Sequence, residues 1–133
     1  MILYHITREG FLPRIRKVGL EPPVFLTGKR DLDAWRDSAA IELFEQGSRG
    51  RLILLKVDIP RDWISERNEH PVGGRTLTEY IVDRGIPPSR IKMTGLHFTI
   101  GQIKGSVIEA RKGKKIISRP VARTGQPAFF ARR

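Results

Sequence analysis

The stretch Met1-Ile2-Leu3-Tyr4-His5-Ile6-Thr7 decides the fold, because this apolar run has strong β propensity and opens directly into a helical pattern. It predicts a buried first strand with His5 near its carboxyl end. A histidine in this position either turns its ring into a cleft from a rigid strand, or is a core residue whose ring nitrogens are both bonded to backbone groups. The strand alone leaves both interpretations open.

A first helix is predicted directly after this strand, over residues 11–18. Phe11, Ile15 and Val18 have the spacing of residues that share one helix face. Thr7 is the candidate cap at the start of the helix, and Gly19 is the residue expected to end it.

A second helix is predicted from Asp31 to about Gln46. Asp31 opens it, and the following apolar residues recur at helical spacing and define one buried face. These residues are Leu32, Trp35, Ala39, Leu43 and Phe44.

The remaining pattern consists of short strands. Residues 51–59 are almost continuously apolar before Pro60, which predicts a central strand buried on both faces. Further strands are expected at 24–27, 77–83 and 90–94, a hairpin at 107–110 and 115–118, and a polar glycine-rich loop at 70–76. Two early helices without regular strand–helix alternation predict an α+β fold with mainly antiparallel sheets.

The composition limits the class of protein. With 133 residues, 39% hydrophobic and 29% charged, the chain is typical of a globular protein with one core of ordinary size. It lacks an apolar run of membrane-spanning length and a secretory signal, so we expect a cytoplasmic protein. The absence of cysteine excludes disulfides and thiolate zinc sites, and His5, His70 and His97 have no metal-ligand spacing.

The positive charge is concentrated near the carboxyl end. Residues 1–100 contain 16 Lys and Arg against 13 Asp and Glu, whereas residues 101–133 contain 9 against Glu109 alone, which gives +3 and +8 of the total +11. This asymmetry predicts a domain over 1–100 and a basic extension over 101–133 that contacts nucleic acid or another polyanion. The alternative is a solvated tail that keeps the protein soluble.

Glu79 is the second candidate site residue. It follows the glycine-rich loop and begins an apolar strand, which is where a rigid element would hold a reactive carboxylate. The alternative is a solvent-facing residue on a strand that alternates between buried and exposed positions.

Four blocks of sequence occur in an order that resembles the ADP-ribosyltransferase superfamily. The opening blocks are Leu3-Tyr4-His5-Ile6-Thr7, residues 15–20 and Val24-Phe25-Leu26-Thr27, and the closing block is Glu79-Tyr80-Ile81-Val82 followed by Ile86-Pro87-Pro88. The resemblance spans about residues 2–94 and is closest to the branch whose site triad is written His-Tyr-Glu. It implies an ADP-ribosyltransferase-like split sheet with two early helices.

The resemblance also implies roles for individual residues. His5 would bond a ribose hydroxyl of NAD, with Thr7 beside it. Phe25, where the family usually has tyrosine, keeps a ring to stack on nicotinamide but lacks the hydroxyl, and Thr27 lies next to it in the cofactor-binding set. Glu79 would be the catalytic carboxylate. We therefore expect His5, Phe25 and Glu79 to meet at one cleft.

The expected activity is transfer of ADP-ribose from NAD to a macromolecular acceptor, either nucleic acid or a nucleic-acid-associated protein. Arg75, in the loop that borders the site, is the candidate substrate-binding residue for a phosphate or carboxylate. The likeness to small toxin-type members also predicts a neutralising partner protein.

Two alternatives remain open. An RNA 2′-phosphotransferase uses NAD on the same fold, but it calls for several arginines around the phosphate, and the strand with His5 lacks an Arg-His-Gly-type block. A non-catalytic nucleic-acid-binding protein on the same scaffold is the alternative from another class.

Overall fold

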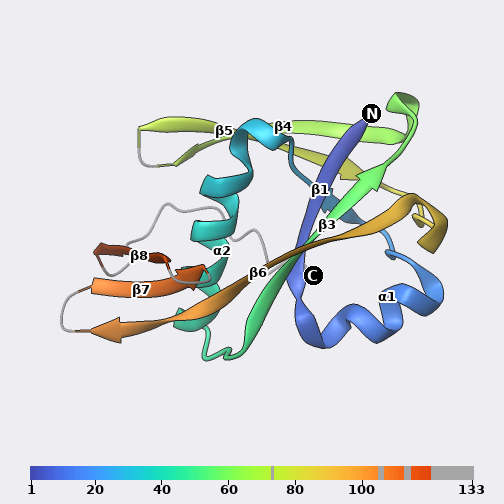
Figure 1. Ribbon diagram of the computed structural model, residues 1–133. Helices are drawn as coiled ribbons and strands as arrows, with labels where there is room; N and C mark the ends of the chain where they lie inside the picture. The colour runs from blue at the N-terminus through green and yellow to red at the C-terminus, as the bar shows by residue number, and fades with distance from the viewer. Residues whose placement is uncertain (73, 105–106, 113–114, 121–133) are drawn as a thin grey trace.

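Two antiparallel sheets form the framework of the protein, and the first strand lies where they meet (Figure 1). The computed structural model describes residues 1–72, 74–104, 107–112 and 115–120. The five-stranded sheet has the order β1-β3-β6-β7-β8 and the three-stranded sheet has the order β2-β5-β4. The strands are β1 Ile2–Arg8, β2 Val24–Leu26, β3 Arg51–Asp58, β4 Ile64–Val72, β5 Arg75–Val82, β6 Ile91–Lys104, β7 Val107–Lys112 and β8 Lys115–Pro120. The predicted α+β class with mainly antiparallel strands is confirmed.

The central strand β3 divides the core into two clusters. Its residues alternate between the two faces of the sheet, and Leu52 and Leu54 pack into the cluster around Trp35. Ile53 and Leu55 pack into the other cluster, which also contains Leu3. The prediction of a strand buried on both faces is therefore confirmed.

The first helix differs from its prediction in how it begins and in what it buries. The helix α1 spans Leu12–Val18 and follows a 3-10 turn over Glu9–Phe11, while Thr7 lies within β1 and caps nothing. Phe11 and Val18 are both 44% exposed, and Ile15 is the buried residue of the helix. The expected apolar face is therefore wrong, because the helix contacts the core cluster through Ile15 and the partly buried Leu12 and not through Phe11 and Val18.

The second helix, α2, spans Leu32–Glu45 (Figure 1), and it buries the expected face. Leu32, Trp35, Ala39 and Leu43 are buried in one cluster, and Phe44 is partly buried against it. Asp31 precedes the helix as predicted, but its side chain makes no capping hydrogen bond.

The predicted loop at 70–76 is wrong, because β4 continues through His70 and Pro71 to Val72, and β5 begins at Arg75. The sequence analysis did not predict this long β4. Since β4 is at the edge of its sheet, it tolerates a proline and a largely polar sequence, which conceal its strand character.

The basic segment continues the five-stranded sheet. The strand β6 passes residue 100, the predicted domain boundary, without interruption as far as Lys104. The predicted hairpin is present as the antiparallel pair β7 and β8, although its turn at 113–114 and the stretch 121–133 lie outside the described residues. Among the described residues, no helix is long and apolar enough to cross a membrane.

Candidate functional site

The three strands that carry the motif residues lie side by side. The backbone of Tyr4 in β1 pairs with that of Thr27 just after β2, with N–O distances of 2.8 and 2.9 Å in the two directions. In turn, β2 pairs with β5, where Leu26 lies opposite Tyr80. Thr27 and Glu79 are the next residues along the two segments, just beyond the paired part of the ladder. Segments remote in sequence therefore meet at one junction between the two sheets.

His5 is fixed at this junction by a bond to the neighbouring strand. Its ring is 4% exposed, and Nδ1 lies 2.9 Å from the carbonyl oxygen of Phe25. A carbonyl oxygen only accepts, so Nδ1 donates, and in the neutral ring Nε2 then has the lone pair. This contact assigns the tautomer of His5.

A cleft of about 310 Å³ opens beside His5. It is bordered by His5 and Thr7 of β1, by Arg14 and Ile15 of α1, and by the connection over residues 19–24. Its volume is at the lower end of the range for ligand sites and suits a nucleoside-sized group. Arg14 forms an ion pair with Glu21, and both side chains are exposed at the cleft.

Gly19 shapes one wall of the cleft. Its φ is +80°, and a Cβ at this position would lie 2.0 Å from the carbonyl oxygen of Ile86. Leu20 and Ile86 then exchange two backbone hydrogen bonds of 2.9 Å. Glycine is needed here because both the backbone conformation and the close approach exclude a side chain.

Glu79 is fully buried in β5. Its Oε1 lies 3.2 Å from Nε2 of His70, whose ring meets Trp35 edge-on with 5.6 Å between the ring centroids. The predicted solvent-facing alternative for Glu79 is therefore wrong. The carboxylate is held on a rigid strand and bonded to a histidine that is itself only 23% exposed.

Of the three predicted triad residues, the cleft described above is bordered by His5 and not by Phe25 or Glu79. Alternation along β1 puts His5 on the face of Leu3, which packs in the second cluster. Alternation along β5 puts Glu79 on the face of Ile81, which packs with Phe25 and Trp35 in the first cluster. His5 and Thr7 border the cleft, whereas Phe25, Thr27 and Glu79 are buried and do not.

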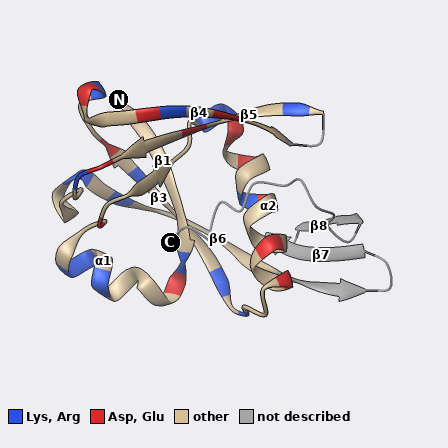
Figure 2. Cartoon of the chain, turned by 180° about the vertical axis from the view of Figure 1, so that it is seen from behind, with Lys and Arg blue, Asp and Glu red and all other residues tan. Residues whose placement is uncertain are grey.

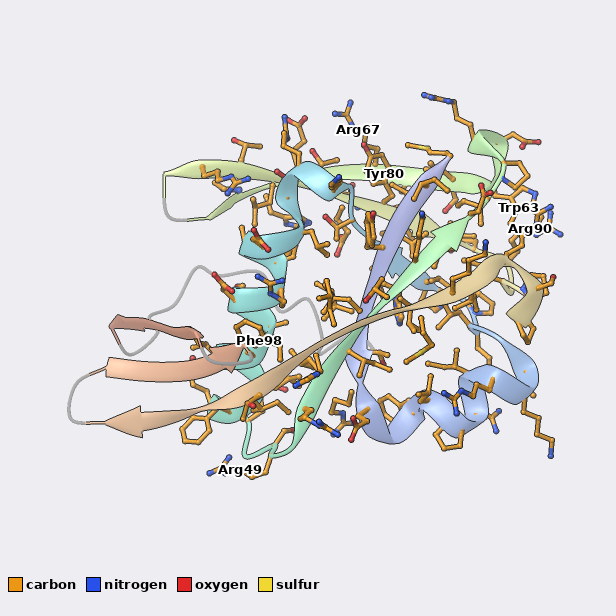
Figure 3. The ribbon with its side chains drawn as sticks, in the orientation of Figure 1. Arg49, Trp63, Arg67, Tyr80, Arg90 and Phe98 are labelled. Atoms are coloured by element: carbon orange, nitrogen blue, oxygen red, sulfur yellow. The ribbon has the colours of Figure 1, made fainter. Side chains whose placement is uncertain are left out.

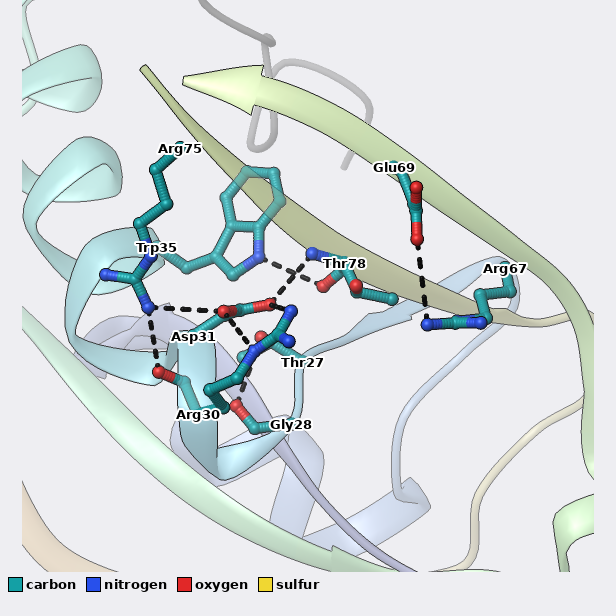
Figure 4. Close-up of polar contacts among 9 residues, drawn as sticks. All are labelled: Thr27, Gly28, Arg30, Asp31, Trp35, Arg67, Glu69, Arg75 and Thr78. Atoms are coloured by element: carbon teal, nitrogen blue, oxygen red, sulfur yellow. Dashed lines mark hydrogen bonds and ion pairs between the residues drawn. The ribbon is translucent and has the colours of Figure 1, made fainter. Parts of the chain in front are cut away.

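Arg75, the predicted substrate-binding residue, is bonded to the start of α2 (Figure 4). Its Nη2 donates to the carbonyl oxygen of Arg30 at 3.0 Å and to Oδ1 of Asp31 at 3.3 Å. Asp31 is 3% exposed and also accepts from the backbone N–H of Thr78 at 2.9 Å. The carboxylate of Asp31 thus connects the start of α2 to β5, and it also accepts a hydrogen bond from the guanidinium of Arg75.

The pKa of Asp31 follows from these contacts. Burial raises the pKa of its carboxyl, but the hydrogen bonds from Arg30 and the Thr78 N–H, with the charges of Arg30 and Arg75, outweigh burial. The net effect holds the pKa of Asp31 below its usual range. A group with a lowered pKa stabilises the fold above its ordinary pKa, and this contribution is lost as the pH falls through the lowered value.

Replacement of Asp31 by Asn should destabilise the protein at neutral pH. The variant keeps the shape but places an amide among guanidinium donors, and we expect a loss of about 1.5–3 kcal/mol in the free energy of unfolding. Urea unfolding at pH 7 and at pH values below 4 measures this loss, which should shrink as the wild-type carboxylate becomes protonated. Asp62→Asn, at an exposed position just before β4, is the matched control, and an equal loss at both pH values would contradict the role of Asp31.

The sequence analysis missed three residues of this region. Arg14 borders the cleft, His70 bonds Glu79, and Asp31 joins α2 to β5. An aspartate before a helix suggests a cap, and no sequence signal distinguishes a cap from a tertiary contact. Among the residues that the structure describes, no group of three or more His, Cys, Asp or Glu side chains is arranged to hold a metal ion.

No family model, curated protein or solved structure matches this chain. The function proposed below therefore depends on the residues and their geometry.

Proposed function

We propose that the protein is an NAD-dependent ADP-ribosyltransferase with the split sheet of that superfamily. The observation that carries the proposal is the junction of β1, β2 and β5, where His5 donates to the carbonyl oxygen of Phe25, Thr27 pairs with Tyr4, and Leu26 lies opposite Tyr80. The resemblance in sequence assigns functional residues to these same three strands. A shared site requires such a common junction of the three strands, and this supports the proposal.

In this proposal the cleft beside His5 takes the nucleoside part of NAD. Nε2 of His5 accepts a ribose hydroxyl, and Arg14 is the cationic group at the cleft for a phosphate. The reaction breaks the bond between ribose C1′ and the nicotinamide nitrogen. The bonding electrons leave with neutral nicotinamide, and an acceptor nucleophile that loses a proton attacks the positive C1′.

Glu79 would stabilise the positive charge that develops on the ribose. A fixed carboxylate does this more strongly in the transition state than in the ground state. Since Glu79 is fully buried and bonded to His70, this step requires His70 to release the carboxylate and the covering side chains to move. The partly exposed His70 is the residue through which such opening would begin.

The proposed acceptor is nucleic acid or a protein bound to it. The support is the excess of 9 Lys and Arg over one Glu in residues 101–133. A transferase of this kind also needs control in its own cell, so a neutralising partner protein is part of the proposal.

The decisive experiment incubates the protein with NAD labelled in its adenylate part and with separate pools of DNA, RNA and protein. Covalent label on one pool, with release of nicotinamide in equal amount, supports the proposal. Absence of both NAD binding and NAD consumption would overturn it.

A second candidate is a nucleic-acid-binding protein without catalytic activity. The observation that favours it is the tight packing around Glu79, which is 0% exposed and lies outside the cleft that His5 borders. This candidate predicts binding of nucleic acid with no effect of NAD, so the same experiment separates the two.

Neutralising the basic segment should weaken binding to nucleic acid. Replacing all 9 Lys and Arg of residues 101–133 by Gln avoids cutting β6. We expect affinity at low salt to fall by more than about tenfold, and the plot of log affinity against log salt to lose about 0.7–0.9 of slope for each phosphate contact removed. Fluorescence anisotropy at four salt concentrations measures both quantities.

The control for this variant replaces Arg16 and Lys17, which are exposed on α1, by Gln (Figure 2). Its slope should change little. Unchanged affinity in the nine-residue variant would show that the basic segment is not the contact surface.

A further inference from the structure

A second concavity, of about 350 Å³, lies at the carboxyl end of β1. One side is formed by residues 8–11, where β1 passes into the 3-10 turn, and the other by residues 49–51, where the chain enters β3. The antiparallel register places Arg8 opposite Leu52, so the two segments are neighbours in space. We call this concavity the arginine pocket.

The arginine pocket is strongly basic. Arg8, Arg49 and Arg51 border it, with Glu9 as the acidic residue among the lining side chains. Arg51 and Glu9 form an ion pair of 2.8 Å, but their side chains are 48% and 45% exposed. An ion pair this exposed is weak and exchanges readily for another anion. The pocket therefore keeps a positive charge that suits phosphate groups.

An aromatic ring lies in the same pocket. Phe11 is 44% exposed, and the guanidinium of Arg8 lies 4.6 Å from its ring centroid. An exposed aromatic ring offers a surface on which an unpaired base can stack. Aromatic rings next to arginines are the combination by which proteins hold single-stranded nucleic acid.

Arg49 lies at the outer side of the pocket, where contacts within the protein hold its guanidinium in place. It lies over the ring of Phe44 at 4.1 Å and donates to the carbonyl oxygen of Ser48 at 2.8 Å. Figure 3 shows Arg49 at the outer end of the molecule, far from Trp63 and Arg90. A guanidinium held in this way has further N–H groups for a phosphate.

We propose that the arginine pocket binds a single strand of nucleic acid, with a base stacked on Phe11 and the backbone phosphates bonded to Arg49 and Arg51. An unpaired base is required because the bases of a duplex are already stacked on one another. Phe11 also borders the cleft beside His5, so a strand in the arginine pocket leads directly to that cleft. Its role as the acceptor for ADP-ribose rests on the proposed function, whereas the binding itself does not.

The test measures binding of a fluorescent oligonucleotide of twelve unpaired nucleotides to the full chain without NAD. Parallel arms use DNA, RNA of the same sequence, and the duplex. Phe11→Ala should weaken binding by about tenfold, the loss expected for one stacked base. The double variant Arg49→Gln, Arg51→Gln should lower the slope against salt by about 1.4, or 0.7 for each lost contact to a single strand.

Matched controls replace side chains of similar exposure elsewhere. Leu96 is 47% exposed and Arg67 is 60% exposed, and Figure 3 shows Arg67 far from Arg49. Leu96→Ala and Arg67→Gln should leave affinity and slope close to wild type. Phe11→Leu keeps apolar volume without a ring, so its loss of affinity should match that of Phe11→Ala.

The outcomes separate this inference from the proposed function. Oligonucleotide binding that depends on Phe11 and the arginines, in a protein that does not consume NAD, supports the pocket and overturns the transferase. If the protein consumes NAD but the variants of the arginine pocket bind the oligonucleotide as well as wild type does, the pocket is overturned and the proposed function is not. Equal binding of duplex and single strands also contradicts it, because stacking on Phe11 would then contribute nothing.

Discussion

Replacement of Glu79 by Gln should lower the rate of NAD consumption by about 100-fold or more, the loss typical of one preorganised electrostatic group. Glutamine keeps the shape and can keep the contact that Oε1 makes with Nε2 of His70 at 3.2 Å, so the fold should persist. NAD binding should change little, because the carboxylate acts mainly on the charge of the transition state. Initial rates of nicotinamide release, together with NAD binding by calorimetry, measure the two effects separately.

Two further variants are compared with Glu79→Gln in the same assays. Glu69→Gln removes an exposed carboxylate from β4 and should leave the rate unchanged. His5→Ala should weaken NAD binding and also slow the reaction, because His5 borders the cleft. Full activity of Glu79→Gln in an assay where the wild type is active would remove Glu79 from the mechanism and leave it as a buried structural carboxylate.

Replacement of Trp35 by Ala should lower the free energy of unfolding by about 3–5 kcal/mol. Trp35 is 0% exposed in the cluster between α2 and the sheets, so the variant leaves a large cavity. Its Nε1 also donates to the carbonyl oxygen of Thr78 at 3.1 Å, and alanine leaves that acceptor without this donor. Urea unfolding followed by circular dichroism measures the loss.

Trp35→Phe keeps an aromatic ring and most of the volume, so its cost comes mainly from the lost donor and only in small part from a cavity. It should cost about 1–3 kcal/mol, the range for an unpaired buried group. The matched control is Trp63→Ala, since Trp63 is only partly buried and lies beneath Arg84 and Arg90. A loss for Trp63→Ala as large as that for Trp35→Ala would show that the cluster around Trp35 is not the main core.

The elements that the sequence predicts well are those whose pattern is set by burial. The strand β3 could be recognised because a strand between two clusters is apolar at nearly every position. The helix α2 could be recognised because a helix that packs on one cluster has apolar residues at helical spacing. The edge strand β4 could not, because an edge strand faces solvent and is selected for polar residues and proline. The missed strand made the segment around His70 look like a loop.

The candidate site was predictable only in part. The order of the strands brings the motif segments together, and the resemblance in sequence was sufficient to predict that they meet. The direction of each side chain depends on alternation along strands whose exact pairing the sequence does not give, and one residue of register moves a side chain to the opposite face. This is why His5 borders the cleft while Glu79 lies on the face of β5 that carries Leu77 and Ile81. The contact between His70 and Glu79 could not be predicted from the sequence for the same reason.

The pairing of Tyr4 with Thr27 has a mechanical consequence. This pair and the bond from His5 to the carbonyl oxygen of Phe25 join β1 to the β2 segment. Each such bond contributes about 0.5–1.5 kcal/mol net. The helix α2 joins the same two sheets a second time, because it packs on β6 of one sheet while Trp35 and Asp31 bond it to β5 of the other. The position of His5 relative to β5 therefore depends on two separate connections, so a variant that loosens α2 should also disturb the cleft that His5 borders.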